Sequence, residues 1–215
     1  MLNFSFLFLL GLNLGGTMPL PMPNNITKVE SYSPGLAPSI GIDFLNWFNK
    51  KTGVSAGLRL ENKGMKSSAS VKEYSMNFED FHGKFNGMVD TEMSFNYLGL
   101  PILARYLFTE NLSVYAGAYY AYLLSGKFKG AANDGFLNSG NGRMEIIREK
   151  YNFSNDLRNH DAGLSIGLNF LPYNERLLLS FDFNYGLVSV FPNDFTGIED
   201  DMQNIYGKLS VGYLF

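Results

Sequence analysis

Residues 161–171 have the sequence DAGLSIGLNFL, in which bulky apolar side chains alternate with small or polar ones up to Phe170. A period of two predicts a β-strand with one apolar face and one polar face. The first face holds Leu164, Ile166, Leu168 and Phe170, and the second holds Gly163, Ser165, Gly167 and Asn169. Small residues fit the crowded interior of a narrow barrel, and bulky apolar residues fit a surface that faces lipid. This stretch therefore predicts a strand of a membrane barrel.

The same alternation recurs in seven further segments of the chain. They are residues 1–14, 37–45, 54–63, 91–108, 112–127, 176–190 and 202–215. In these segments one face holds nearly every charge and amide, and Phe, Leu and Tyr dominate the other. We therefore expect an all-β fold, an eight-stranded antiparallel transmembrane β-barrel in the bacterial outer membrane. A soluble barrel with its apolar face inside is the alternative, and these side chains are too bulky for such a narrow interior.

Composition agrees with one barrel domain over residues 1–215. Aromatic residues make up 15% of the chain and charged residues 17%, whereas soluble chains carry about 25% charged residues. The mean hydropathy is −0.06, which does not fit a helical membrane protein with spans of about 20 apolar residues. A net charge of −3 argues against a nucleic-acid partner, and the absence of cysteine excludes disulfides and thiolate metal sites.

The first 14 residues, MLNFSFLFLLGLNL, allow two interpretations. They alternate like the other segments, which predicts a first barrel strand. An apolar N-terminal stretch is also typical of a signal peptide, so a signal remnant is the alternative. The first basic residue is Lys28, and no Ala-x-Ala site follows Leu14, which favours the strand.

The links between these segments alternate strictly in length. The short links are residues 46–53, 109–111 and 172–175, and the long links are residues 16–35, 64–90, 126–160 and 191–201. Outer-membrane barrels combine short periplasmic turns with long extracellular loops, so both termini are expected in the periplasm. The chain ends in LSVGYLF at Phe215. An alternating strand with a terminal aromatic residue resembles the signal that the barrel-assembly machinery recognises, which makes that machinery an expected partner.

Several strands carry a more specific signature. Residues 97–106 read YLGLPILARY, residues 117–125 end in Tyr-Leu-Leu-Ser, and residues 161–163 read DAG. Together with Tyr185-Gly186-Leu187 and the GYLF end, they resemble the outer-membrane β-barrel domain proteins of Bacteroidota, a porin-like group that includes PorT-like proteins. The resemblance implies an outer-membrane barrel, and its PorT-like branch implies a role in secretion across that membrane. Gly99 stands where the family commonly has Glu, so an interior carboxylate of the family is missing here.

Signs of catalytic or metal chemistry are weak. His82 and His160 are the only histidines, and His160 lies near Ser154 in sequence, a pair that a rim-active hydrolase or acyltransferase would use. A solvated histidine at a strand end is the simpler interpretation. Residues 199–201, EDD, with Asp194 offer oxygen ligands for a divalent cation, but they lack EF-hand spacing. We expect no catalytic residue, no cofactor and no metal site.

Two sets of residues are expected to shape the barrel. The inward face carries the charged residues Asp43, Arg59, Glu61, Lys63, Arg105, Asp182 and Lys208. Ions removed from water must be paired, so we expect one network with Arg59 and Arg105 as bidentate centres, and Arg105 bound to Glu61 or Asp182. The alternative is that Lys63 and Lys208 reach the rim and stay solvated. A periplasmic aromatic girdle is expected from Trp47, Phe48, Phe108, Phe170, Tyr173 and Phe215.

The filled lumen predicts a non-enzymatic outer-membrane protein that acts as a structural, binding or accessory component of the envelope. Its expected surroundings are outer-membrane lipid and lipopolysaccharide, with a protein partner in an outer-membrane complex such as a secretion machinery. A small-solute channel and a rim-active hydrolase or acyltransferase are the alternatives.

Overall fold

The computed structural model describes residues 3–78, 81–140, 142–172 and 176–215. The described residues form ten strands. They are β1 (Asn3–Pro19), β2 (Ile26–Pro34), β3 (Ala37–Trp47), β4 (Thr52–Phe78), β5 (Phe81–Thr109), β6 (Leu112–Ser139), β7 (Gly142–Asn152), β8 (His160–Phe170), β9 (Leu177–Ser189) and β10 (Met202–Leu214). All of the pairings between them are antiparallel. Among the described residues, no helix has the length and apolar character needed to cross a membrane.

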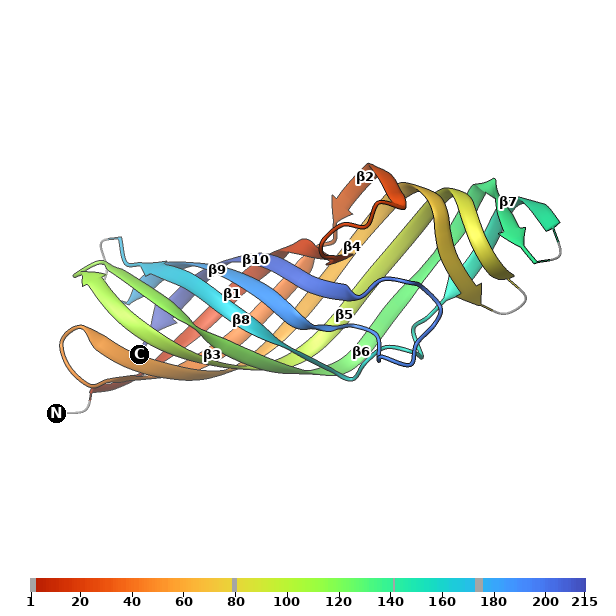
Figure 1. The fold of residues 1–215 in the computed structure, drawn as a ribbon. Helices are drawn as coiled ribbons and strands as arrows, with labels where there is room; N and C mark the ends of the chain where they lie inside the picture. The colour runs from red at the N-terminus through yellow and green to blue at the C-terminus, as the bar shows by residue number, and fades with distance from the viewer. Residues whose placement is uncertain (1–2, 79–80, 141, 173–175) are drawn as a thin grey trace.

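A ring of strands closes through the pairing of β1 with β10. The order around it is β1-β3-β4-β5-β6-β8-β9-β10. β2 pairs with β4 and β7 pairs with β6, both beyond the ring (Figure 1). The expected count of eight strands is therefore two short, although the predicted class of fold is correct. Residues 3–19 form a ring strand, as the first interpretation of the N-terminal segment expected.

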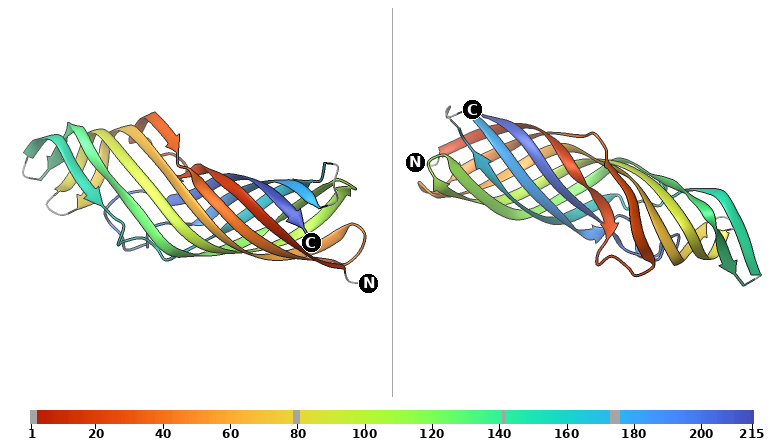
Figure 2. Two further views of the ribbon diagram at one scale, coloured as in Figure 1. Left: turned by 180° about the vertical axis from the view of Figure 1, so that it is seen from behind. Right: turned by 90° about the horizontal axis from the view of Figure 1, so that it is seen from above.

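Three strands are far longer than a membrane requires. β4, β5 and β6 have 27, 29 and 28 residues, whereas about 9–11 residues cross a bilayer. Beyond the ring they continue as a sheet in the order β2-β4-β5-β6-β7, which projects from the end opposite the two termini (Figures 1 and 2). The turns between β3 and β4 and between β5 and β6 lie at the end with the termini, as expected for a periplasmic side (Figure 1).

The long links at residues 64–90 and 126–160 are mostly strand, which corrects the expectation of loops. The alternation there is interrupted, because the register shifts between Val71 and Tyr74 on β4. Glu73 lies inside that shift with a φ of 53°, in the left-handed region. Such a bulge changes which face the next residue points to, so a strict period of two does not continue through it.

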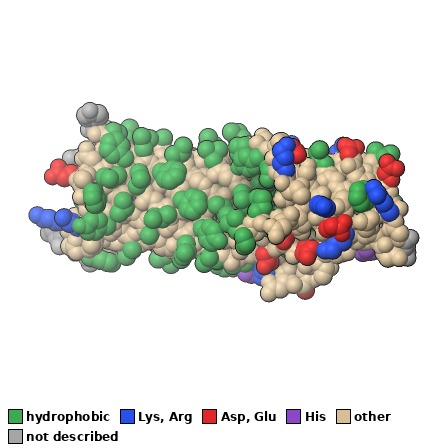
Figure 3. Space-filling model, turned by 45° about the horizontal axis from the view of Figure 1, so that its top comes forward, with side chains coloured by type: hydrophobic (Ala, Val, Ile, Leu, Met, Phe, Trp, Pro, Cys, Tyr) green, Lys and Arg blue, Asp and Glu red, His purple; other side chains and the backbone are tan. Residues whose placement is uncertain are grey.

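On the face seen in Figure 3, apolar side chains cover the ring and end before the projecting sheet. Leu168 and Phe181 point outward with 39% and 43% of their surface exposed, while Ser165 and Ser180 on the same two strands are buried. The predicted assignment of faces is therefore correct for these strands. In the projecting half, charged side chains replace the apolar ones on the visible surface.

The outward position of Leu168 predicts a strong effect of a charge there. Leu168→Arg is expected to destabilise the barrel by ~2–4 kcal/mol near the membrane midplane, because the guanidinium meets hydrocarbon. Ile147→Arg is the matched control: Ile147 is 81% exposed on β7, beyond the ring, and its replacement is expected to be silent. Urea unfolding of the protein folded into lipid vesicles measures both variants. Equal losses of stability would overturn the assignment of the lipid-facing surface.

Candidate functional site

The lumen of the ring collects the charged residues that the alternation placed inward. Six of them are less than 5% exposed: Asp43, Arg59, Lys63, Arg105, Asp182 and Lys208. The seventh, Glu61, has an 11% exposed side chain. Because ions out of bulk water require partners, their contacts decide what the lumen can do.

Arg59 lies at the centre of the network. It donates to Asp43 through Nε and Nη2, with Nη2 2.9 Å from Oδ2. Its Nη1 donates to Oδ1 of Asp182 at 3.3 Å. β4 and β9, which carry Arg59 and Asp182, lie four strands apart in the ring in either direction. This ion pair therefore crosses the full width of the lumen.

Arg105 has a different partner from the one expected. Its Nη2 donates to Oδ2 of Asp43 at 3.0 Å and its Nε to Oγ of Ser55 at 2.7 Å. Its guanidinium also lies over the ring of Tyr115, 4.6 Å from the centroid. The expectation of Glu61 or Asp182 was wrong because Asp43 already stands between the two guanidiniums. Arg105 binds one carboxylate oxygen, so Arg59 is the bidentate centre and Arg105 is not.

The network continues from Asp182 toward the end that carries the projecting sheet. Nζ of Lys208 lies 2.9 Å from Oε1 of Glu61 and 3.9 Å from Oδ1 of Asp182. A side chain at Gly99 would start 3.8 Å from Oε2 of Glu61. Glu61 thus lies beside the space that Gly99 leaves open.

Lys63 forms the next layer with a residue that the sequence analysis missed. Its Nζ lies 3.0 Å from Oδ2 of Asp161 on β8, and both side chains are 2% exposed. The ring centroids of Tyr97 and Tyr119 each lie 5.1 Å from this ammonium group. Lys63 and Lys208 are buried and paired, so the alternative of solvated rim lysines is wrong.

Asp161 completes the charge balance of the lumen. The seven expected residues comprise four bases and three acids, and Asp161 makes four of each. A signal for it existed, because Asp161 shares the inward phase of Gly163 and Ser165 on the same strand. A buried set without net charge avoids the large cost of an uncompensated ion.

An apolar layer lies below the ions, toward the end with the termini. Leu7, Leu9, Leu45 and Leu178 are at most 5% exposed and pack together, with Leu171 and Leu214 against them. At the other end, Phe85, Phe95 and Phe128 belong to a large buried cluster of the projecting sheet. Ions therefore occupy the middle of the lumen, between two apolar layers.

The aromatic residues of the expected girdle lie at the end with the termini. Phe48, Phe108, Phe170 and Phe215 are exposed, and Trp47 is half-buried where β3 turns into β4. Tyr173 lies outside the described residues. Their role at the periplasmic interface stays a prediction.

The candidate catalytic residues, His160 and Ser154, remain apart. His160 stacks on Tyr120, with ring centroids 6.0 Å apart. Oγ of Ser154 donates to Oδ1 of Asn152 at 2.6 Å, and within the described ranges no hydrogen bond joins it to His160. In that part of the chain, no three His, Asp or Glu side chains form a possible metal-binding group.

Neutralising Asp43 tests the network. Asp43→Asn keeps the shape but leaves two buried guanidiniums without their shared carboxylate, so we expect a loss of about 3–5 kcal/mol in the free energy of unfolding. The control is Glu92→Gln, because Glu92 pairs with Lys66 and Lys129 at 3.5 and 3.7 Å on an exposed surface. That change is expected to cost less than ~1 kcal/mol. Similar losses in urea titrations would mean that the lumen ions contribute no more than surface pairs.

Comparisons with known proteins give the family. Two solved structures of Ail, the attachment invasion locus protein of Yersinia pestis, one in complex with the heparin analogue sucrose octasulfate, are 14% and 15% identical, with TM-scores of 0.43 and 0.44. In both cases the match covers 99% of this chain and 97% of the other. Neisserial surface protein A is 12% identical over 98% of this chain and 95% of its own, with a TM-score of 0.34. No curated protein sequence matches. The family model of the outer membrane protein beta-barrel domain matches residues 2–192, and the chain, an outer-membrane protein, belongs to that family.

Proposed function

We propose that this outer-membrane protein is non-enzymatic and non-conducting, and that it serves the envelope as a binding or accessory component through its projecting sheet. The observation that carries the proposal is the content of the lumen. Ion pairs reach across the bore from opposite strands, and apolar layers lie on both sides of them. An eight-stranded ring leaves room for side chains only, so no continuous path for water or solutes is expected.

The projecting sheet supplies the binding surface in this proposal. β7 pairs with β6 along one edge, and no described strand pairs with the other edge. Ile147 and Met144 on β7 are 81% and 48% exposed, although they lie outside the lipid-facing surface. An unpaired strand edge with exposed apolar side chains favours a protein partner that adds a strand. The charged neighbours Arg143, Glu145, Arg148, Glu149 and Lys150 would select that partner and discourage unspecific pairing.

The resemblance to PorT-like proteins suggests the more specific role. In that version the partner is a component of a secretion machinery in the outer membrane. Outer-membrane lipid and lipopolysaccharide would surround the ring, and the barrel-assembly machinery would receive β10 with its terminal Phe215. A small-solute channel is the competing function.

Single-channel recording separates the proposal from the channel. Purified protein inserted into planar bilayers is expected to give no steady conductance, because the charged side chains fill the bore. A large porin recorded under the same conditions verifies that insertion can be detected. Reproducible conductance steps from the wild-type barrel would contradict the closed lumen and favour the channel.

Site-specific crosslinking tests the binding surface. A photoreactive residue, p-benzoylphenylalanine, at Ile147 is expected to give a defined protein adduct in the native host. The control is the same residue at Ile102, which is 67% exposed on the lipid-facing surface of β5 and is expected to give none. Mass spectrometry of the adduct identifies the partner and shows whether it belongs to a secretion machinery. Absence of an adduct at Ile147, or equal adducts at both positions, would refute the proposed surface.

A further inference from the structure

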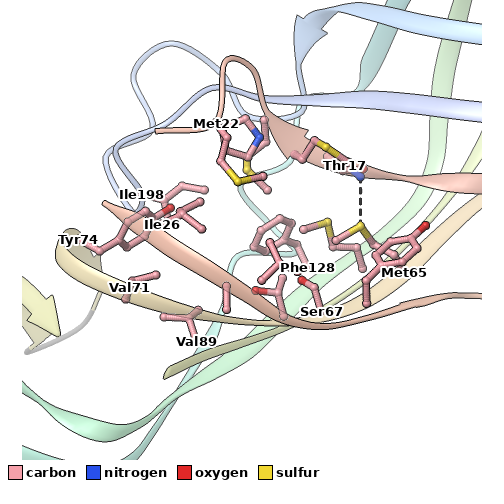
Figure 4. Close-up of a pocket in the computed structure, with 18 of the residues that line it drawn as sticks. Thr17, Met22, Ile26, Met65, Ser67, Val71, Tyr74, Val89, Phe128 and Ile198 are labelled. Atoms are coloured by element: carbon pink, nitrogen blue, oxygen red, sulfur yellow. Dashed lines mark hydrogen bonds between the residues drawn. The ribbon is translucent and has the colours of Figure 1, made fainter. Parts of the chain in front are cut away.

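Where the ring meets the projecting sheet, the structure contains a cavity of about 130 Å³. Figure 4 shows it between the end of β1, the inner face of β4 and the strand β2. Six of the nine methionines of the chain line it: Met18, Met22, Met65, Met76, Met93 and Met202. No charged side chain is among the described residues that line it. Unbranched thioether side chains adapt to ligands of varying shape, which makes them common at permissive binding surfaces.

Four of the six polar side chains in the described cavity wall, those of Thr17, Tyr32, Thr91 and Tyr151, already have protein partners. The Thr17 backbone N–H donates to the Met65 sulfur at 3.2 Å, and Oγ1 of Thr17 donates to Asn204 at 2.7 Å. The hydroxyls of Thr91 and Tyr151 bond to each other at 2.7 Å. Burial raises the pKa of Tyr74 and of Tyr151 above the usual tyrosine range, so both stay uncharged. The cavity therefore offers a ligand apolar contact and little hydrogen bonding.

The irregular strand β2 forms the open side of this cavity. Ile26, Val29 and Tyr32 all line it, although residues three apart on a regular strand point to opposite faces. Two register shifts against β4, between Ile26 and Lys28 and between Val29 and Ser31, bring them onto one face. Val29 and Tyr32 are each 45% exposed, and Met22 is 47% exposed, whereas Met76 and Met93 on the inner wall are at most 3% exposed. The cavity thus runs from an apolar, accessible mouth to a buried wall.

Its position is close to the hydrocarbon of the outer leaflet. Leu14, 50% exposed, is an outward apolar residue of β1, and Thr17 of the cavity wall follows three residues later. Three residues of a strand span about 10 Å, and the tilt of barrel strands reduces the height. An apolar chain that leaves the lipid surface can therefore reach the mouth.

We propose that this cavity binds the hydrocarbon chain of an amphiphile, with the polar head left outside. The volume is similar to the ~150 Å³ of a dry apolar cavity that takes up benzene, so it has room for roughly six carbon atoms of the chain. The uncharged wall selects the chain and not the head. The amphiphile is either a lipid of the bilayer or a free alcohol or fatty acid. Contacts between lipid chains and the methionine methyl groups distinguish the two sources.

Methionine methyl groups allow the test with the wild-type protein. The chain, labelled with ¹³C at the methionine methyls and placed in lipid nanodiscs, is titrated with 1-octanol. We expect saturable shifts of the methyl signals of Met65, Met76 and Met93, while Met88 and Met144, which do not line the cavity, stay unchanged. Nuclear Overhauser contacts from lipid-chain protons to Met65 before octanol is added, lost with chain-deuterated lipid, identify the bilayer as the source. Octanol shifts without such contacts identify a free amphiphile.

Two matched variants of β2 complete the test. Val29→Glu puts a charge at the mouth and is expected to weaken octanol binding at least tenfold. Ser31→Glu places the same charge on the other face of the strand, where Ser31 borders a separate polar groove, and is expected to leave binding unchanged. Both positions are exposed, so folding is expected to be preserved. The proposal is overturned if octanol and lipid leave the cavity methyls unaffected, if all methionines shift alike, or if the two variants bind equally.

Discussion

Closure of the ring between β1 and β10 is the constraint on which the rest of the structure depends. Within hydrocarbon, each backbone N–H and C=O must find its partner inside the protein, so an open sheet edge is not tolerated. The pairing extends from Leu7 opposite Leu214 to Pro19 opposite Met202. Closing a ring of only eight strands makes the bore narrow, and the inward side chains must fill it. Small residues, tyrosines and ion pairs between long side chains fill the bore together.

The same constraint explains what could be predicted from the sequence. It acts on every strand of the ring, so the alternation identified the faces and placed seven charged residues in the lumen. Their pairing could not be predicted, because contacts across the bore depend on the relative heights of distant strands. Arg105 and Asp43 illustrate this, since β4 lies between their two strands. Asp161 was predictable in principle: it continues the inward phase of β8 by one step beyond Gly163.

The projecting sheet was not predicted from the sequence, for a different reason. On β2, two register shifts bring residues that are three apart in sequence onto the same face. On β4, the bulge at Glu73 changes which residues point inward. Neither strand therefore keeps a period of two. β7 is exposed at nine of its eleven residues, a pattern that is typical of a solvated loop as much as of an edge strand. Bulges are set by the geometry of both paired strands. A single strand sequence therefore does not reveal them.

β4 also shows how the surrounding medium governs the pattern. Up to Lys63 its inward residues are polar or glycine, and its outward ones, such as Leu58 and Leu60, are exposed apolar residues. From Met65 onward the inward face is mostly apolar, with Ser67 as an exception. The outward residues become polar at the same height, where Asn62 donates to Asn96 at 2.8 Å. Below this height the exterior is hydrocarbon, and above it the exterior is water, so the two faces exchange character. The predicted strand ended at residue 63 because the rule of polar inside and apolar outside ends there, while the strand itself continues.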